Sequence, residues 1–175
     1  MINNTVIKSM IERRSVRSFS SKQITEEELN TVLEAGTYAP TGRNLQSPLI
    51  VAVRDKETVK KLSDLNAAVM GSDRDPFYGA PCVVVVFADP SVHTYLEDGS
   101  LVMGNLLNAA HACGLGSCWI HRAKEVFDSE SGKALMRKWG VDEKYVGIGN
   151  CILGYTQGDL PEARLRKDGY IIKID

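Results

Sequence analysis

The sequence lacks an excess of charge of either sign. Its 175 residues carry 21 lysines and arginines against 22 aspartates and glutamates, so that the net charge is −1. A chain balanced in this way has no bulk attraction to nucleic acid or to an anionic membrane. The length is sufficient to bury a core without metals or disulfides, and we expect a single domain over residues 1–175.

Long hydrophobic segments and cysteine motifs are also missing. The longest apolar run, residues 83–88, is far too short to span a bilayer, and the N-terminal residues show no apolar stretch after a basic start. The four cysteines, at positions 82, 113, 118 and 151, form no C-x-x-C pair. They are typical of reduced, buried thiols, and with only three histidines no metal site is expected. We therefore expect a cytoplasmic protein.

Several signatures of catalysis and phosphate binding are absent. No G-x-S-x-G elbow occurs, no G-x-G-x-x-G follows a strand, and there is no P-loop. The histidines lack an obvious nucleophile partner, and nothing beside Cys118 in the sequence marks it as a reactive thiol. No catalytic side chain is predicted, and any bound phosphate must be held by side chains.

Basic side chains gather in two short stretches that could hold such a phosphate. "ERRSVRSFS" places Arg13, Arg14 and Arg17 around Ser15, and a second group near the end contains Arg164 and Arg166. Forked guanidinium donors match the oxygens of a phosphate, although a solvated helix end would carry similar residues. The two groups could converge on one dianion.

Between them lies the proline-bounded stretch "PTGRNLQSP". Its amides, Asn44 and Gln46, suit the edge of a heterocycle with alternating N–H and C=O groups. A polar loop between a helix and a strand is the alternative reading of the same residues.

Hydrophobic periodicity predicts an α+β fold with long helices packed on a central sheet. Helices are expected at residues 5–14, 25–39, after Asp55, at 92–113, and in a segment ending at Trp139 and Gly140; strands are expected at 49–53, 82–88, 146–154 and 170–174, with "LGSCWI" extended. The last strand could join its own sheet or reach a partner subunit.

Taken in order, these motifs resemble the flavin (FMN)-dependent nitroreductase family. "ERRSVRSFS" and "APTGRNLQSP" are similar to its opening elements, and "DPFYGAPCVVVVFAD", "GLGSCWI" and "PEARLRKDGY" are similar to its later blocks. The resemblance covers nearly the whole chain. It implies a nitroreductase-like α+β fold with a mixed or antiparallel sheet, and a homodimer with FMN at the subunit interface. The long helix over residues 92–113 is then expected at the centre of that interface.

The resemblance also implies a set of cofactor contacts. The phosphate would be held by the basic residues, the ring by the proline-to-glutamine loop and by "GLGSCWI", and the pyrimidine edge by Asn66. The implied residues are Arg13, Arg14, Ser15, Arg17, Pro40, Thr41, Asn44, Gln46, Asn66, Leu115, Gly116, Ser117, Trp119, Arg164 and Arg166. Thr41 stands where the family often has Ser, and Arg43 adds a cation with no assigned target.

The implied activity is flavin chemistry. NADH or NADPH would deliver hydride to flavin N5, and a nitroaromatic, quinone or similar acceptor would then take its place in a ping-pong mechanism. No protein acid or base is needed for this reaction. The alternative is a flavoenzyme of the same fold with another reaction, such as reductive dehalogenation or flavin fragmentation.

Overall fold

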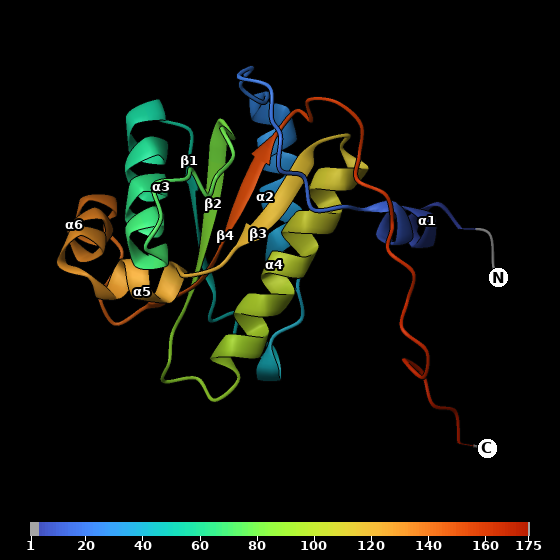
Figure 1. The fold of residues 1–175 in the computed structure, drawn as a ribbon. Helices are drawn as coiled ribbons and strands as arrows, with labels where there is room; N and C mark the ends of the chain where they lie inside the picture. Colours follow the sequence, from blue (N-terminus) through green and yellow to red (C-terminus); the bar gives the residue numbers. More distant parts are fainter. Residues whose placement is uncertain (1–3, 175) are drawn as a thin grey trace.

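A four-stranded antiparallel sheet forms the centre of the molecule (Figure 1). The computed structural model describes residues 4–174, so that the two ends of the expected domain, residues 1–3 and 175, lie outside it. The strands are β1 (Leu49–Val53), β2 (Cys82–Ala88), β3 (Gly116–Ile120) and β4 (Val146–Gly154). Their order in the sheet is β1-β2-β4-β3, which leaves β1 and β3 at opposite edges.

Helices cover both faces of the sheet and confirm the predicted α+β class (Figure 1). The helices are α1 (Thr5–Glu12), α2 (Glu26–Thr37), α3 (Lys56–Met70), α4 (Tyr95–Ala112), α5 (Ala123–Asp128) and α6 (Glu130–Trp139), with a short 3-10 turn η1 (Gly42–Asn44). α3, α5 and α6 pack on one face, and α2 and α4 on the other. α1 lies beside this body and has no buried residue.

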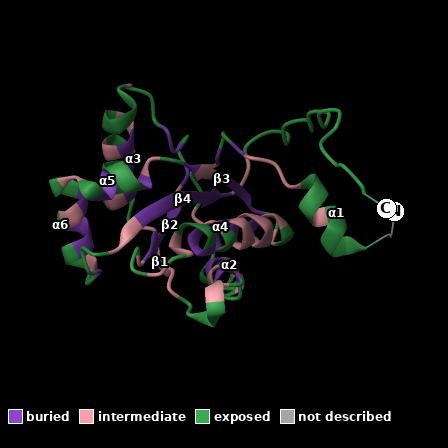
Figure 2. Cartoon of the chain, turned by 90° about the horizontal axis from the view of Figure 1, so that it is seen from below, coloured by how far each residue is buried: buried purple, intermediate pink, exposed green. Residues whose placement is uncertain are grey.

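Strand β2 is buried on both faces, which explains its unbroken valine run. Val83 and Val85 point into the core shared with α3, α5 and α6, whereas Val84 and Val86 point into the core shared with α2 and α4. Successive side chains of a strand point to opposite faces of the sheet. Both faces of β2 can therefore be apolar only if every residue of the strand is apolar. In Figure 2 the central strands β2 and β4 are accordingly coloured mostly as buried, and β2 is buried along its whole length.

Local signals explain where the helices begin and end. Thr25 and Glu28 form the expected capping box at the start of α2. α4 begins at Tyr95 rather than at residue 92, because Asp89 holds a turn by accepting a hydrogen bond from Ser91 N at 2.9 Å. The helix expected to end at Gly140 is in fact two helices, because Ser129 ends α5 and caps α6.

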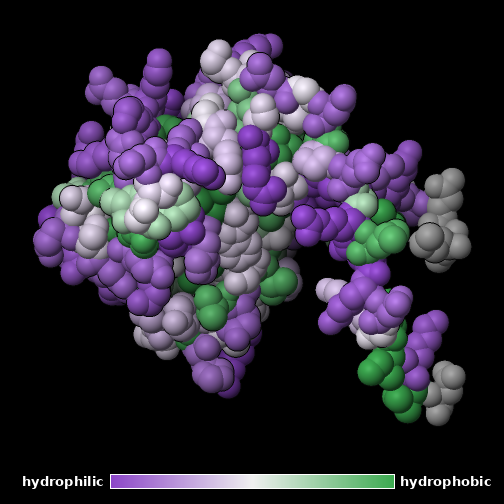
Figure 3. All heavy atoms as spheres, in the orientation of Figure 1, coloured by the Kyte–Doolittle hydropathy of each residue, from purple (hydrophilic) through white to green (hydrophobic). Residues whose placement is uncertain are grey.

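The predicted strand at residues 170–174 is wrong for the single chain. The C-terminal tail, residues 157–174, leaves the body in irregular conformation, and Figures 1 and 3 show it extending past α1 with apolar atoms exposed. Ile171, Ile172 and Ile174 are 76%, 81% and 89% exposed. A strand requires a neighbour for its backbone hydrogen bonds, and the tail finds none in its own sheet. Among the described residues, no helix combines the length and hydropathy needed to cross a membrane.

Candidate cofactor site

The arginine segment, residues 13–17, lies directly against strand β3. Val16 N donates to Ser117 O at 2.9 Å, and Ser15 pairs with Ser117 in a parallel bridge. Further along, Phe19 pairs with Thr156 just after β4. Two of the groups predicted from separate motifs, the N-terminal arginines and "GLGSCWI", are therefore neighbours in the fold.

Three polar side-chain atoms of the arginine segment and of β3 are buried without a hydrogen-bond partner. They are Arg13 Nη1, Ser117 Oγ and Trp119 Nε1, and among the residues described only Arg54 Nε shares that condition. A buried donor without a partner costs free energy, typically about 1–3 kcal/mol. All three residues were predicted as cofactor contacts from the sequence. Their unused donors suit a ligand rich in hydrogen-bond acceptors.

The other two arginines of the segment have different environments. Arg14 Nη1 donates to Ile11 O at 2.7 Å and to Arg13 O at 2.8 Å, which satisfies a carbonyl at the C-terminal end of α1. Arg17 is exposed. Leu115 and Gly116 are buried where the chain turns from α4 into β3, with Leu115 N donating to Ala110 O at 2.8 Å.

The proline loop, residues 40–46, lies at the other end of α4. Gly42 N donates to Asp98 Oδ1 at 2.9 Å, and Asp98 belongs to the first turn of α4, whereas Leu115 is bonded to its last turn. At about 1.5 Å per residue, the 12 residues from Asp98 to Ala110 span about 18 Å. The single chain therefore does not bring this loop to the arginine segment.

The proline loop has a strained and defined shape. Arg43, Asn44 and Gln46 all adopt left-handed backbone conformations, with φ of 53°, 54° and 49°. Thr41 Oγ1 accepts from Gln46 N at 3.1 Å, and Asn44 Oδ1 accepts from Gln46 Nε2 at 3.3 Å. The exposed amides predicted to contact a heterocycle are thus held next to each other. Thr41 and Gln46 also line a cavity of about 360 Å³ between this loop, β1 and α4.

Asp98 is a site residue that the motif search missed. Its side chain is 2% exposed, and its Oδ2 accepts from Ser47 Oγ at 3.3 Å and from Thr94 Oγ1 at 3.1 Å. The signal available in the sequence was the pair of carboxylates, Glu97 and Asp98, in the otherwise apolar and small-residue stretch "LEDGSLVMG", because one of two acids on a largely apolar helix must face the core, where acids are rare unless they are paired. Through its hydrogen bonds from Gly42 N and Ser47 Oγ, Asp98 connects the proline loop to α4.

Three predicted contacts lie apart from these groups. Asn66 is fully buried, donates to His121 O at 2.8 Å and accepts from Arg122 Nε at 3.0 Å, so that both ends of its amide are used within the chain. Arg164 and Arg166 are exposed on the C-terminal tail, where Arg166 Nη2 donates to Arg164 O at 2.6 Å. In a single chain, Arg164 and Arg166 therefore do not meet the arginine segment.

The thiols near the site are unsuited to nucleophilic chemistry. Burial raises the pKa of Cys82 to about 12 and also raises the pKa of Cys151. Both therefore stay protonated near neutral pH. Within the described residues, no group of three or more His, Cys, Asp or Glu side chains is arranged to hold a metal ion.

A sequence profile of the nitroreductase family matches residues 10–155, which is most of the chain and includes the arginine segment, the proline loop and β3. The chain belongs to the nitroreductase family. This family membership confirms the resemblance drawn from the ordered motifs.

Relatives and solved structures agree with the family assignment. A protein of Archaeoglobus fulgidus, provisionally named NADH dehydrogenase/NAD(P)H nitroreductase, is 33% identical over 87% of this chain and 86% of its own. An FMN reductase [NAD(P)H] of Bacillus subtilis is 29% identical over 65% of this chain and 53% of its own. The fold matches a nitroreductase with bound FMN from Bacteroides fragilis with a TM-score of 0.91 at 29% identity, covering 99% and 100% of the two chains.

Proposed function

We propose that this nitroreductase-family chain is an FMN-dependent oxidoreductase that takes hydride from NADH or NADPH and passes it to a nitroaromatic, a quinone or a similar acceptor by a ping-pong mechanism. The observation that carries the proposal is that Arg13, Ser117 and Trp119, all on the arginine segment or on β3, have buried polar atoms without a hydrogen-bond partner. Relatives named as NAD(P)H-dependent FMN reductases, and the FMN-bound structural relative, support FMN as the ligand that these donors meet.

The residues of this chain would bind and orient the flavin. Arg13, Ser15 and Arg17 provide cationic and hydroxyl groups for the phosphate, and charge-assisted bonds of this kind contribute about 1.5–3 kcal/mol each. Leu115 to Trp119 place backbone and indole N–H groups beside them. When bound, FMN accepts hydride from the nicotinamide and later reduces the acceptor. The protein then needs no acid or base of its own.

A second copy of the chain would complete the site. The proline loop and the arginine segment lie at opposite ends of α4, and we propose that the loop and the segment that contact one flavin come from different subunits. The surface beside the arginine segment is suited to such an interface. Val6, Met10 and Ile11 of α1 are 62%, 52% and 58% exposed, and a hollow of about 630 Å³ separates α1 from α4.

The C-terminal tail is the second element suited to a homodimer. Its isoleucines are exposed in the single chain. Strand β1 lies at an edge of the sheet, so one of its sides is not paired with another strand of the sheet. A tail that crosses to the second subunit would bury these side chains and carry Arg164 and Arg166 toward the partner.

The visible absorption spectrum of the purified protein, followed by anaerobic addition of NADH and then NADPH, tests the proposal. We expect flavin bands that bleach with at least one of the two nucleotides. Bands that persist with both would reject the reductase function in favour of another flavin reaction, such as dehalogenation or flavin fragmentation. A colourless protein that takes up no added FMN would reject the cofactor.

The Arg13→Ala variant tests the phosphate site directly. Loss of one charge-assisted bond should weaken FMN binding by about 10- to 100-fold, measured by flavin fluorescence quenching. Arg166→Ala should have a similar effect if the tail contributes to the same phosphate. Arg137→Ala, which removes an exposed arginine paired with Glu143, is the control. Full flavin occupancy in both test variants would show that the phosphate is bound elsewhere.

A further inference from the structure

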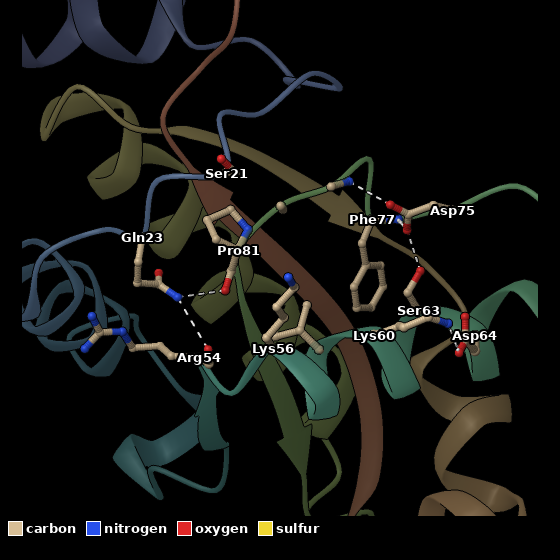
Figure 4. A pocket seen from close by; sticks show the side chains of 13 residues that line it. Ser21, Gln23, Arg54, Lys56, Lys60, Ser63, Asp64, Asp75, Phe77 and Pro81 are labelled. Carbon is tan, nitrogen blue, oxygen red and sulfur yellow. Dashed lines mark hydrogen bonds and ion pairs between the residues drawn. The ribbon is translucent and has the colours of Figure 1, made fainter.

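A second cavity, on the side of the sheet away from α2 and α4, has no role in the proposed flavin site. Its volume is about 560 Å³, within the range of about 300–1,000 Å³ typical of small-molecule sites. Val59, Phe77, Ala80 and Pro81 supply apolar walls, and Ser21 and Gln23 close one side (Figure 4). The cavity adjoins the end of β1, whereas the arginine segment lies along β3 at the opposite edge of the sheet.

The walls of this cavity are fixed by hydrogen bonds that do not involve a ligand. Asp75 accepts from Phe77 N at 2.8 Å and from Gly79 N at 2.7 Å, and it also accepts from Ser63 Oγ. These bonds hold Tyr78 in a left-handed conformation, with φ of 54°. Across the cavity, Gln23 Nε2 donates to Pro81 O at 2.9 Å. The site is therefore preformed, which lowers the cost of binding.

One cationic group faces the cavity without an anionic partner. Lys60 pairs with Asp64 at 2.6 Å, and the guanidinium of Arg54 points away in Figure 4, toward its ion pair with Glu26. Lys56 takes part in none of the ion pairs among residues 4–174. In the view of Figure 4 its ammonium group lies between Pro81 and Phe77.

The acidic residues around the cavity do not cancel this charge. Asp64 is neutralised by Lys60, and the carboxylate of Asp75 is occupied by the N–H and hydroxyl donors of its own wall. Lys56 is also the first residue of α3, where the helix dipole favours a negative group. Apolar walls with one free cation select a ligand with an apolar body and one negative charge.

We propose that this cavity binds a small organic anion, an aromatic carboxylate, whose ring packs against Phe77 and Pro81 and whose carboxylate pairs with Lys56. The proposal does not rest on the proposed oxidoreductase function, because no residue of the cavity belongs to the flavin site. Binding should therefore be the same in the presence and absence of bound FMN.

Isothermal titration calorimetry with 2-naphthoate tests the proposal, since this probe has no nitro or quinone group that the protein could reduce. We expect saturable binding at one site per chain. Lys56→Gln should weaken it by about tenfold, the effect of one charge-assisted bond. The neutral analogue 2-naphthamide should bind the Lys56→Gln variant and the unmodified protein equally. Ser21→Trp, which fills the cavity from its exposed side, should abolish binding.

Lys61→Gln is the matched control, because Lys61 is an exposed lysine of the same helix that does not line the cavity. Thermal unfolding of each variant checks that the fold is intact. Binding that survives both Lys56→Gln and Ser21→Trp, or that is displaced by FMN, would overturn the proposal. Tighter binding after replacing Ile171, Ile172 and Ile174 with serine would also overturn it, because the tail of a second copy would then be the occupant.

Discussion

Single residues at the proposed flavin site would serve two purposes, contact with the cofactor and positioning of the residues that contact it. Arg13, Ser117 and Trp119 carry buried polar atoms without a hydrogen-bond partner, which we propose contact FMN, whereas Asp98 holds the proline loop. Left-handed conformations of non-glycine residues cost about 1–3 kcal/mol each, and three of them occur in the proline loop. The hydrogen bonds from Gly42 N and Ser47 Oγ to Asp98, on either side of these three residues, help to offset that cost.

Asp98→Asn tests this positioning role. Replacing one carboxylate oxygen by an NH₂ group removes the charge-assisted bonds to the loop, so that FMN affinity should fall by about tenfold. Flavin fluorescence titration measures the affinity, and thermal unfolding separates it from a loss of stability. Glu97→Gln, an exposed neighbour in α4, is the control. Unchanged affinity in an Asp98→Asn protein would mean that the loop keeps its shape without this carboxylate.

Glu28 links protonation to stability at the start of α2. Hydrogen bonding from Thr25 N, reinforced by Tyr155 Oη at 2.8 Å, lowers the pKa of Glu28 below its ordinary value of 4.5, against the opposing effect of burial. A carboxylate whose pKa is lower in the folded state than in the unfolded state stabilises the fold at pH values above its unfolded-state pKa. This stabilisation is lost as the pH falls through the folded-state pKa.

Glu28→Gln should therefore destabilise the protein at pH 7 by about 1 kcal/mol, the size of a capping interaction. The difference from the unmodified protein should shrink as the pH falls below 4.5. Urea unfolding between pH 3 and pH 7 measures the loss of stability and its dependence on pH. Glu27→Gln, at an exposed position of the same helix, is the control. A difference that is independent of pH would show that packing, not ionisation, accounts for the effect.

At the scale of elements, close packing explains boundaries that periodicity did not resolve. α5 and α6 are separated only by Ser129, and the second helix folds back so closely that Gly132 meets the backbone of the first. A Cβ added at Gly132 would lie 2.0 Å from Val126 O and 2.7 Å from Phe127 Cα. The glycine is required by this approach, not by its backbone angles.

Gly132→Ala should destabilise the protein by at least about 1–3 kcal/mol, the usual cost of overpacking, although alanine is the better helix former. Thermal or urea unfolding gives the change in the free energy of unfolding. Ser131→Ala, at the exposed neighbouring position, should be nearly neutral. If Gly132→Ala proves as stable as the unmodified protein, α5 and α6 can separate more easily than their contact indicates.

For the whole molecule, the incomplete surfaces point to assembly. α1 and the C-terminal tail expose apolar side chains, as the green residues along the tail in Figure 3 illustrate. Within one chain the groups predicted to bind FMN remain in three places: the arginine segment with β3, the proline loop, and the tail. The proposed homodimer would account for both features.

Replacing Ile171, Ile172 and Ile174 with serine should raise the dimer dissociation constant by at least about a hundredfold. Burial of one such side chain contributes about 1.5–3 kcal/mol, so even partial burial of three reaches this value. Sedimentation velocity over a range of concentrations measures it. Lys173→Ser in the same segment is the control. A flavin-loaded monomer in the unmodified protein would contradict the proposed assembly.

The sequence by itself determined most of the elements and supplied the residues of the candidate site. Periodicity, the Thr25–Glu28 capping box and the valine run of β2 specify local structure, because each depends on residues a few positions apart. The arginine segment and "GLGSCWI" were found as motifs for the same reason. Family membership followed from their order along the chain.

Only the tertiary structure decided which of these groups meet. Ser15 pairs with Ser117, and Gly42 bonds to Asp98, across separations of 102 and 56 residues (117 − 15 and 98 − 42). Such contacts depend on how the sheet and α4 pack, which no local pattern encodes. The strand predicted at residues 170–174 fails in the single chain for the same reason, because a strand requires a neighbour and the tail pairs with no strand of its own sheet.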